Sequence, residues 1–163
     1  QSADWQCRIS VADIESDGPF SSFPGVDRWL AVVQGAGVLL RLPEGERRLD
    51  RDSTALHFPG ESAPDCQLVH GPTRDLNLMS VRGAGRASMQ QALPGVPWIC
   101  RATLRALFSA DPVTLRCTGA DPLPVAPFAL VWAEDGAAGN WSLDSAGDDQ
   151  RAWWLSFTIG PDP

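Results

Sequence analysis

Glycine and proline constrain the fold of this chain more than any other feature of the sequence. The 163 residues include 15 glycines and 14 prolines, which are spread along the whole chain. Strong turn signals made of these residues include Asp17-Gly18-Pro19 and Pro24-Gly25. They cut the chain into short apolar segments at intervals of roughly 8–12 residues. That pattern predicts an all-β chain folded as a barrel or a sandwich.

The apolar segments between these turns are read as strands. Segment 98–109 alone has the propensity for a helix, but its neighbours favour a strand there as well. The expected strands lie in 5–14, 29–42 (two strands meeting at Gly35-Ala36-Gly37), 45–58, 66–83 (two strands about Gly71-Pro72), 98–109, 112–119, 127–134 and 150–160.

Two segments interrupt this rhythm. The stretch 83–95, "GAGRASMQQALPG", is small and polar and predicts a flexible linker between two β halves. The stretch 134–150 is acidic and rich in loop-forming residues, and it predicts a mobile loop.

Composition argues against several classes of function. The net charge is −7, and all thirteen basic residues are arginine. An acidic protein repels phosphate backbones, so nucleic-acid binding is disfavoured. The longest apolar runs, such as "WLAVV", are too short to cross a bilayer, and no signal peptide is visible. We therefore expect a cytoplasmic protein with no nucleic-acid or membrane partner. A homodimer formed through strand edges stays open, since no sequence feature selects a surface.

The cysteines and histidines provide little basis for a metal site. The four cysteines are widely separated and form no C-x-x-C pair, which favours buried thiols over zinc ligands or disulfides. The only histidines are His57 and His70, and the His-x-His pair of metal-binding barrels is missing. A two-histidine site with Glu61 or Asp75 stays open as an alternative. No nucleophile elbow or G-x-G-x-x-G loop is present, so no catalytic residue, metal or other cofactor is assigned.

Polar side chains on the expected strands suggest a pocket for a small molecule. The two-residue period places Arg8 and Ser10 on one face of the first strand. In "HGPTRDLNLM" the same period puts Arg74 on one face and Asp75 and Asn77 on the other. Only one of Arg74 and Asp75 can then face a pocket, and the other is a structural partner. A buried arginine near carboxylates indicates either an internal ion pair or a binding site, and the residues alone do not decide between them.

Three long segments resemble the HutD/Ves family: "WQCRISVADIESDGPFSSFPGVDRWLAVVQGAGVLL", "LHFPGE" and "GPTRDLNLM". The likeness covers residues 5–83, and it is weaker over 98–159. The family's N-terminal Trp-x-Asn-Gly-Gly-Gly-type segment is lacking here. The positions that look shared with the family are Arg8, Ser10, Asp13, Asp17, Phe20, Arg28, His57, Phe58, Glu61, Arg74, Asp75 and Asn77. Some of them could serve the fold only, and Arg28 could form an ion pair with Asp27.

The resemblance implies a bicupin, that is, two small antiparallel β-barrels of the RmlC-like cupin type in one chain. The first barrel, with the candidate pocket, would span 1–85 and the second 86–163, with strand exchange between the lobes left open. It also implies a cytoplasmic bacterial protein associated with histidine utilisation.

The function expected on this basis is non-catalytic binding of a small anionic metabolite. The ligand would be an intermediate of histidine degradation, urocanate or a formylated glutamate, and binding would tune histidine utilisation. The alternative is a metal-dependent cupin enzyme acting on a small carboxylic acid. The expected ligand-binding residues are Arg8, Ser10, Asp13, Phe20, His57, Phe58, Glu61, Arg74 and Asn77.

Overall fold

The protein is built from β-strands, as the spacing of the turns predicts. The computed structural model describes residues 4–134, 138–144 and 150–160. It divides into two compact units, the first containing the described residues up to Arg86 together with Gly160, and the second Ala87–Ile159. Neighbouring strands run antiparallel in both units, for example residues 7–14 with 73–80 in the first and 104–109 with 152–157 in the second. No helix among the described residues is long and apolar enough to cross a bilayer.

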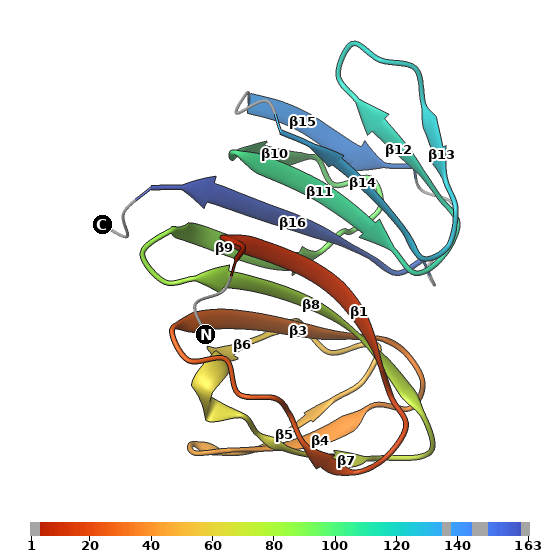
Figure 1. Ribbon diagram of the computed structural model, residues 1–163. Coiled ribbons are helices and arrows are strands. Elements are labelled where there is room, and N and C mark those ends of the chain that lie inside the picture. Colours follow the sequence, from red (N-terminus) through yellow and green to blue (C-terminus); the bar gives the residue numbers. More distant parts are fainter. Residues whose placement is uncertain (1–3, 135–137, 145–149, 161–163) are drawn as a thin grey trace. The chain divides into compact units, whose positions relative to one another are not determined.

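The first unit consists of two four-stranded sheets, with strand orders β1-β8-β3-β6 and β2-β7-β4-β5 (Figure 1). Its elements are β1 (Cys7–Ile14), β2 (Gly18–Pro19), β3 (Val26–Gln34), β4 (Val38–Leu42), β5 (Gly45–Leu49), β6 (Leu56–Pro59), the short 3-10 helix η1 (Gly60–Ser62), β7 (Asp65–Leu68) and β8 (Thr73–Val81).

The second unit also has two four-stranded sheets, ordered β14-β11-β16-β9 and β10-β15-β12-β13. Its strands are β9 (Gly85–Gln91), β10 (Trp98–Arg101), β11 (Leu104–Ser109), β12 (Val113–Cys117), β13 (Leu123–Val125), β14 (Ala129–Ala133), β15 (Ala138–Leu143) and β16 (Ala152–Ile159). Segment 98–109 forms strands, not a helix, as its neighbours predict.

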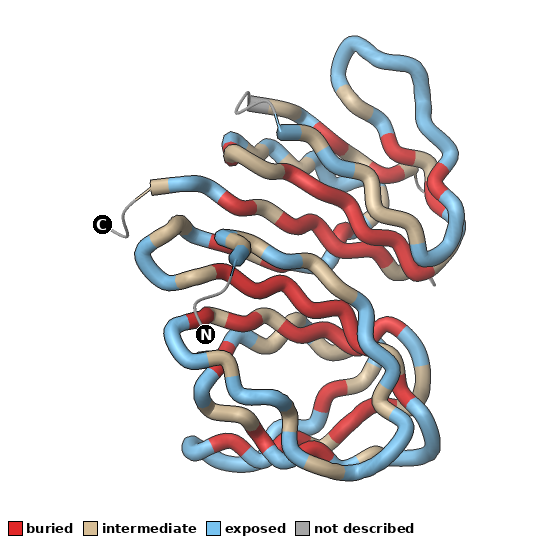
Figure 2. The backbone as a smooth tube through the Cα atoms, viewed as in Figure 1, coloured by how far each residue is buried: buried red, intermediate tan, exposed pale blue. Residues whose placement is uncertain are grey.

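Each unit has its own core between its two sheets. In the first unit, Leu30 and Val32 of β3 pack with Val38 and Leu40 of β4 on the facing sheet. In the second unit, Leu107 of β11 belongs to a cluster with residues of both sheets. Figure 2 shows these buried stretches in red along β3, β8, β11 and β16, while the hairpin ends are exposed. Alternating inward apolar residues therefore hold each pair of sheets together.

Two expectations about irregular segments are wrong. The stretch 83–95 is not a linker throughout, because β9 joins the edge of a sheet in the second unit and buries Ala87 and Met89. The stretch 134–150 is not all loop, since β15 pairs with β10 and β12. Both strands are rich in small and polar residues, which conceals the alternation. Residues 135–137 and 145–149, where a mobile loop is predicted, lie outside the described residues.

Gly37 is needed for the close approach of the turn between β3 and β4 to the end of β5. Its φ is +103°, and a Cβ added there would lie 2.2 Å from the backbone oxygen of Leu49. Gly45 also has a positive φ, +127°, but a Cβ there would meet nothing within 4 Å.

We expect Gly45→Ala to cost about 1–3 kcal/mol of unfolding free energy through backbone strain alone. Gly37→Ala should lower the free energy of unfolding clearly more, because the backbone near Leu49 must move to admit the new Cβ. Urea denaturation of both variants measures the difference. Equal losses in the two variants would contradict a steric role for Gly37.

Candidate functional site

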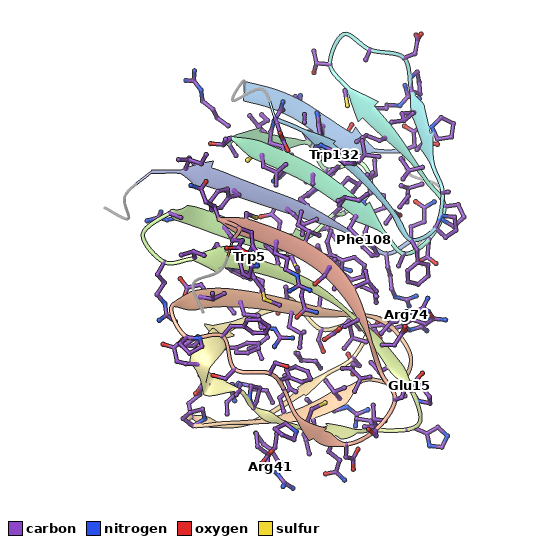
Figure 3. All side chains as sticks on the ribbon, viewed as in Figure 1. Trp5, Glu15, Arg41, Arg74, Phe108 and Trp132 are labelled. Carbon is purple, nitrogen blue, oxygen red and sulfur yellow. The ribbon has the colours of Figure 1, made fainter. Side chains whose placement is uncertain are left out.

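The first unit contains a cavity of about 530 Å³ between β1, β8 and the segment that follows β1. β1 contributes Arg8 and Ser10 to its lining, and β8 contributes Asp75 and Asn77. Glu15, labelled in Figure 3, is an exposed lining residue just beyond the end of β1. The cavity is therefore lined mainly by polar side chains from neighbouring strands, with aromatic residues from the segment 16–23.

Strand register explains why these polar residues meet. Ser10 of β1 lies directly opposite Asn77 of β8, and Arg8 lies opposite Met79. On the other side of β8, Met79 lies opposite Arg28 of β3. Residues opposite each other in an antiparallel pair point to the same face, so all five side chains point to the cavity side of this sheet.

Arg28 is the central polar group of the site. Only 6% of it is exposed, and its guanidinium Nε donates a hydrogen bond to Oδ1 of Asn77 at 2.8 Å. Asn77 in turn donates through Nδ2 to Oδ1 of Asp75 at 3.1 Å. The guanidinium carbon lies 4.6 Å from the ring centre of Phe20 and 5.5 Å from that of Phe58. The cation is thus held by one amide and two aromatic rings.

The electrostatics of Arg28 and Asp75 reflect burial together with mutual attraction. Burial raises the pKa of Asp75 to about 6, although the nearby Arg28 charge and the hydrogen bond from Asn77 act to lower that pKa. Burial also lowers the pKa of Arg28, and the Asp75 carboxylate opposes that change. Asp75 can therefore gain or lose a proton near neutral pH, whereas the guanidinium stays charged.

Five of the nine residues expected to bind ligand line this cavity: Arg8, Ser10, Asp13, Phe20 and Asn77. The other four do not belong to its lining. Phe58 is close, since it is 1% exposed and packs in the core beneath the Arg28 guanidinium. His57 precedes it on β6 and therefore points to the opposite face, where it stacks on Trp29 at 4.6 Å between ring centres.

Arg74 and Glu61 are surface ion-pair residues instead of cavity residues. Arg74 points away from the strands (Figure 3) and donates to the carboxylate of Asp13, with both side chains exposed. Glu61 accepts two hydrogen bonds from Arg82, which also donates to Asp27. The suggested pairing of Asp27 with Arg28 is therefore wrong, because neighbouring residues on a strand point to opposite faces.

Sequence reasoning left Arg28 and Asp75 out of the expected binding set. The signal for Asp75 was present, because alternation allows only one of Arg74 and Asp75 to face the cavity. For Arg28 the signal is its spacing from the buried Leu30 and Val32, which share its face of β3. A charged residue that lies on the same face of a strand as core residues is expected to be buried together with polar partners.

The described residues contain no group of three or more histidine, cysteine, aspartate or glutamate side chains arranged to hold a metal ion. His57 lies on the face of its sheet opposite the cavity, and His70 is exposed in the bend before β8. The alternative of a two-histidine site with Glu61 or Asp75 gains no support from these positions.

Comparison with known proteins identifies the family. Residues 1–149 match the HutD family. The chain belongs to the HutD family. A Pseudomonas putida protein described as an uncharacterized 21.2 kDa protein in the hutC 3' region is 40% identical over 83 residues. Protein Ves from Citrobacter koseri is 31% identical over 90 residues. These matches cover 51% and 55% of this chain, and they span only 44% and 47% of the relatives' lengths.

Solved structures confirm the HutD-type fold. HutD from Pseudomonas fluorescens SBW25, in a formate condition, is 27% identical with a TM-score of 0.80, covering 95% of this chain and 80% of that one. A conserved protein of unknown function from Pseudomonas aeruginosa PAO1 is 26% identical, also with a TM-score of 0.80, covering 96% of this chain and 84% of that one. A salicylate 1,2-dioxygenase from Pseudoaminobacter salicylatoxidans, 8% identical with a TM-score of 0.60 over 94% of this chain and 68% of that one, shares the fold alone. The expected bicupin of two small barrels is confirmed.

The raised pKa of Asp75 predicts a specific pH dependence of stability. The unfolded carboxyl has a pKa near 3.8 and the folded one a pKa of about 6, so the folded state binds more protons between these values. Proton binding by Asp75 therefore contributes up to about 3 kcal/mol to the free energy of unfolding. This contribution is fully present below about pH 4 and is lost as the pH rises through about 6.

Asp75→Asn keeps the shape and the acceptor for Asn77 but cannot titrate. Urea denaturation at a series of pH values should show the wild type losing stability relative to this variant between about pH 4 and 7. A wild type and variant with parallel pH profiles would contradict the assignment.

Proposed function

We propose that this HutD-family chain binds a small anionic metabolite in the cavity of its first barrel without catalysing a reaction. The ligand would be an intermediate of histidine degradation, urocanate or a formylated glutamate, and its binding would tune histidine utilisation. The observation that carries the proposal is the buried Arg28 guanidinium, which lines the cavity while Asn77 holds its orientation.

The geometry of Arg28 suits recognition of a carboxylate. A guanidinium presents its donors in a rigid fork that matches two carboxylate oxygens. Among the described residues, the hydrogen bond that Arg28 makes uses Nε, so the terminal nitrogens keep their donors for a ligand. Phe20 stacks on the guanidinium and limits its movement, which reduces the entropy lost on binding.

The size and walls of the cavity agree with a metabolite of this class. A volume of about 530 Å³ lies in the usual range for small-molecule sites. Phe20 and Phe23 give the lining an apolar part against which a planar or aliphatic body can pack. Arg8 adds a second cation, and Ser10 adds a hydroxyl opposite Asn77. Relatives described as a hutC-region protein and as HutD support histidine degradation as the source of the ligand.

The acidic residues of the lining are largely engaged elsewhere. Asp13 accepts from Arg74, and Asp17 accepts from the backbone N–H of Leu68 at 2.8 Å. Asp75 lies within electrostatic reach of Arg28, so an anion bound at Arg28 would raise the pKa of Asp75 further. Binding of a carboxylate would therefore be coupled to uptake of a proton by Asp75.

Thermal-shift measurements with urocanate, formylglutamate, histidine and formate test the proposal. A ligand at a hundredfold excess over its Kd should stabilise the protein by about 2.7 kcal/mol and raise Tm. Arg28→Met should abolish the shift, because it removes the donors while keeping an apolar chain. Arg48→Met is the matched control, since it removes an exposed arginine of the first unit that pairs with Asp50 away from the cavity, and it should keep the full shift. No shift with any of the four compounds, or equal loss in both variants, would refute the proposal.

Proton uptake gives the site a second signature. Formate does not titrate above about pH 5, so calorimetric titrations with it report the protein's own protons. We expect its Kd to be several-fold lower at pH 5.5 than at pH 7.5, because protonated Asp75 no longer competes for Arg28. Asp75→Asn should bind equally well at both values. A wild-type Kd that does not change with pH would exclude the coupling.

A further inference from the structure

The cavity of the first unit is lined by a second arginine, Arg8, which comes from β1. β1 is an edge strand of its sheet (Figure 1), and Arg8 is exposed. Arg8 lies opposite Met79 of β8, and Met79 lies opposite Arg28 of β3. The two arginines therefore stand on the same face of the sheet, two strands apart, with their backbones roughly 10 Å from each other.

The two arginines differ in the partners that the protein gives them. Arg28 is buried, donates to Asn77 and has the Asp75 carboxylate within electrostatic reach. Arg8 forms no hydrogen bond or ion pair with any other residue that the structure describes. The protein thus compensates the buried cation itself, whereas the exposed cation keeps its donors for a molecule in the cavity.

The positive charges of the two arginines repel each other. Burial lowers the pKa of Arg28, the Asp75 carboxylate opposes that change, and the charge of Arg8 adds to the lowering. A negative charge placed near Arg8 relieves this repulsion and is itself attracted by the guanidinium. The cavity therefore favours a ligand that brings an anionic group to Arg8 as well as one to Arg28.

The carboxylates in the described part of the lining lie further along β1 and beyond its end. Asp75 stands opposite Ala12, which is four residues from Arg8, or about 13 Å at the usual rise of a strand. Asp13 and Glu15 follow Ala12 in the chain and are more distant still. These side chains are therefore poorly placed to neutralise Arg8 in place of a ligand.

We propose that the ligand of the first barrel is a short dicarboxylate, with one carboxylate held deep in the cavity by Arg28 and the other held by Arg8 near the surface. This inference rests on the proposed function and narrows its ligand class. A formylated glutamate has two carboxylates, whereas urocanate has one and would use Arg28 alone. One arginine is buried and the other exposed, which suits two separate anionic groups better than one group shared by both. Arg8 is then the residue that determines specificity for the second charge.

Calorimetric titration of the full chain at pH 7.5 with glutarate and with its monoamide, glutaramate, tests this inference. The two probes have nearly the same shape, but glutarate carries one more negative charge at this pH. We expect the wild type to bind glutarate at least tenfold more tightly than glutaramate, because only glutarate can form a charged pair with Arg8. Equal Kd values for the two acids would overturn the inference and leave carboxylate binding at Arg28, the basis of the proposed function, intact.

Two variants and a control attribute the preference to Arg8. Arg8→Met should fold, since it removes an exposed side chain, and should weaken glutarate binding at least tenfold while leaving glutaramate binding unchanged. Arg28→Met should weaken the binding of both acids. Arg48→Met removes an exposed arginine that pairs with Asp50 outside the cavity, so it changes the net charge equally and should keep the wild-type preference.

The outcomes separate this inference from the proposed function. A preference for glutarate that survives Arg8→Met, or one that Arg48→Met removes as well, would overturn the inference alone. If neither acid binds to the wild type, the proposed function fails and the inference fails with it.

Discussion

Burial of the Arg28 guanidinium is the interaction on which the first barrel's site depends. A buried cation is costly unless neighbouring groups compensate for lost hydration. Here Asn77 accepts its hydrogen bond, Asp75 supplies opposite charge, and Phe20 and Phe58 pack against its plane. These partners come from β8, β6 and the segment after β2, so the register of the strands determines whether the cation is tolerated.

The same arrangement links stability to binding. Asn77 bonds to both Arg28 and Asp75, so its amide orientation is fixed from two sides. The Arg28 guanidinium is therefore preorganised beside the cavity. The arrangement has an electrostatic cost at Asp75, because burial disfavours its charged form and raises its pKa to about 6. Sites that bind ligands commonly retain such unfavourable groups, because a ligand relieves part of the cost.

Much of the fold, and part of the site, could be predicted from sequence. The turn signals and the two-residue period predict β3, β4 and β8, and alternation correctly separates Arg74 from Asp75. It cannot show which of the two faces inward, because that depends on partner strands distant in sequence. For the same reason His57 seemed as suitable as Phe58, although adjacent residues face opposite ways.

Nitrogen-15 resonances of the arginine guanidinium groups during titration with urocanate test the central claim most directly, since they report contact at a named side chain. If Arg28 binds the urocanate carboxylate, rotation about its guanidinium bonds slows, so its terminal Nη signals should shift and sharpen. The Nη signals of Arg74 should stay unchanged. Shifts centred on Arg74, or an Arg28 spectrum that saturating urocanate leaves unaltered, would contradict the claim.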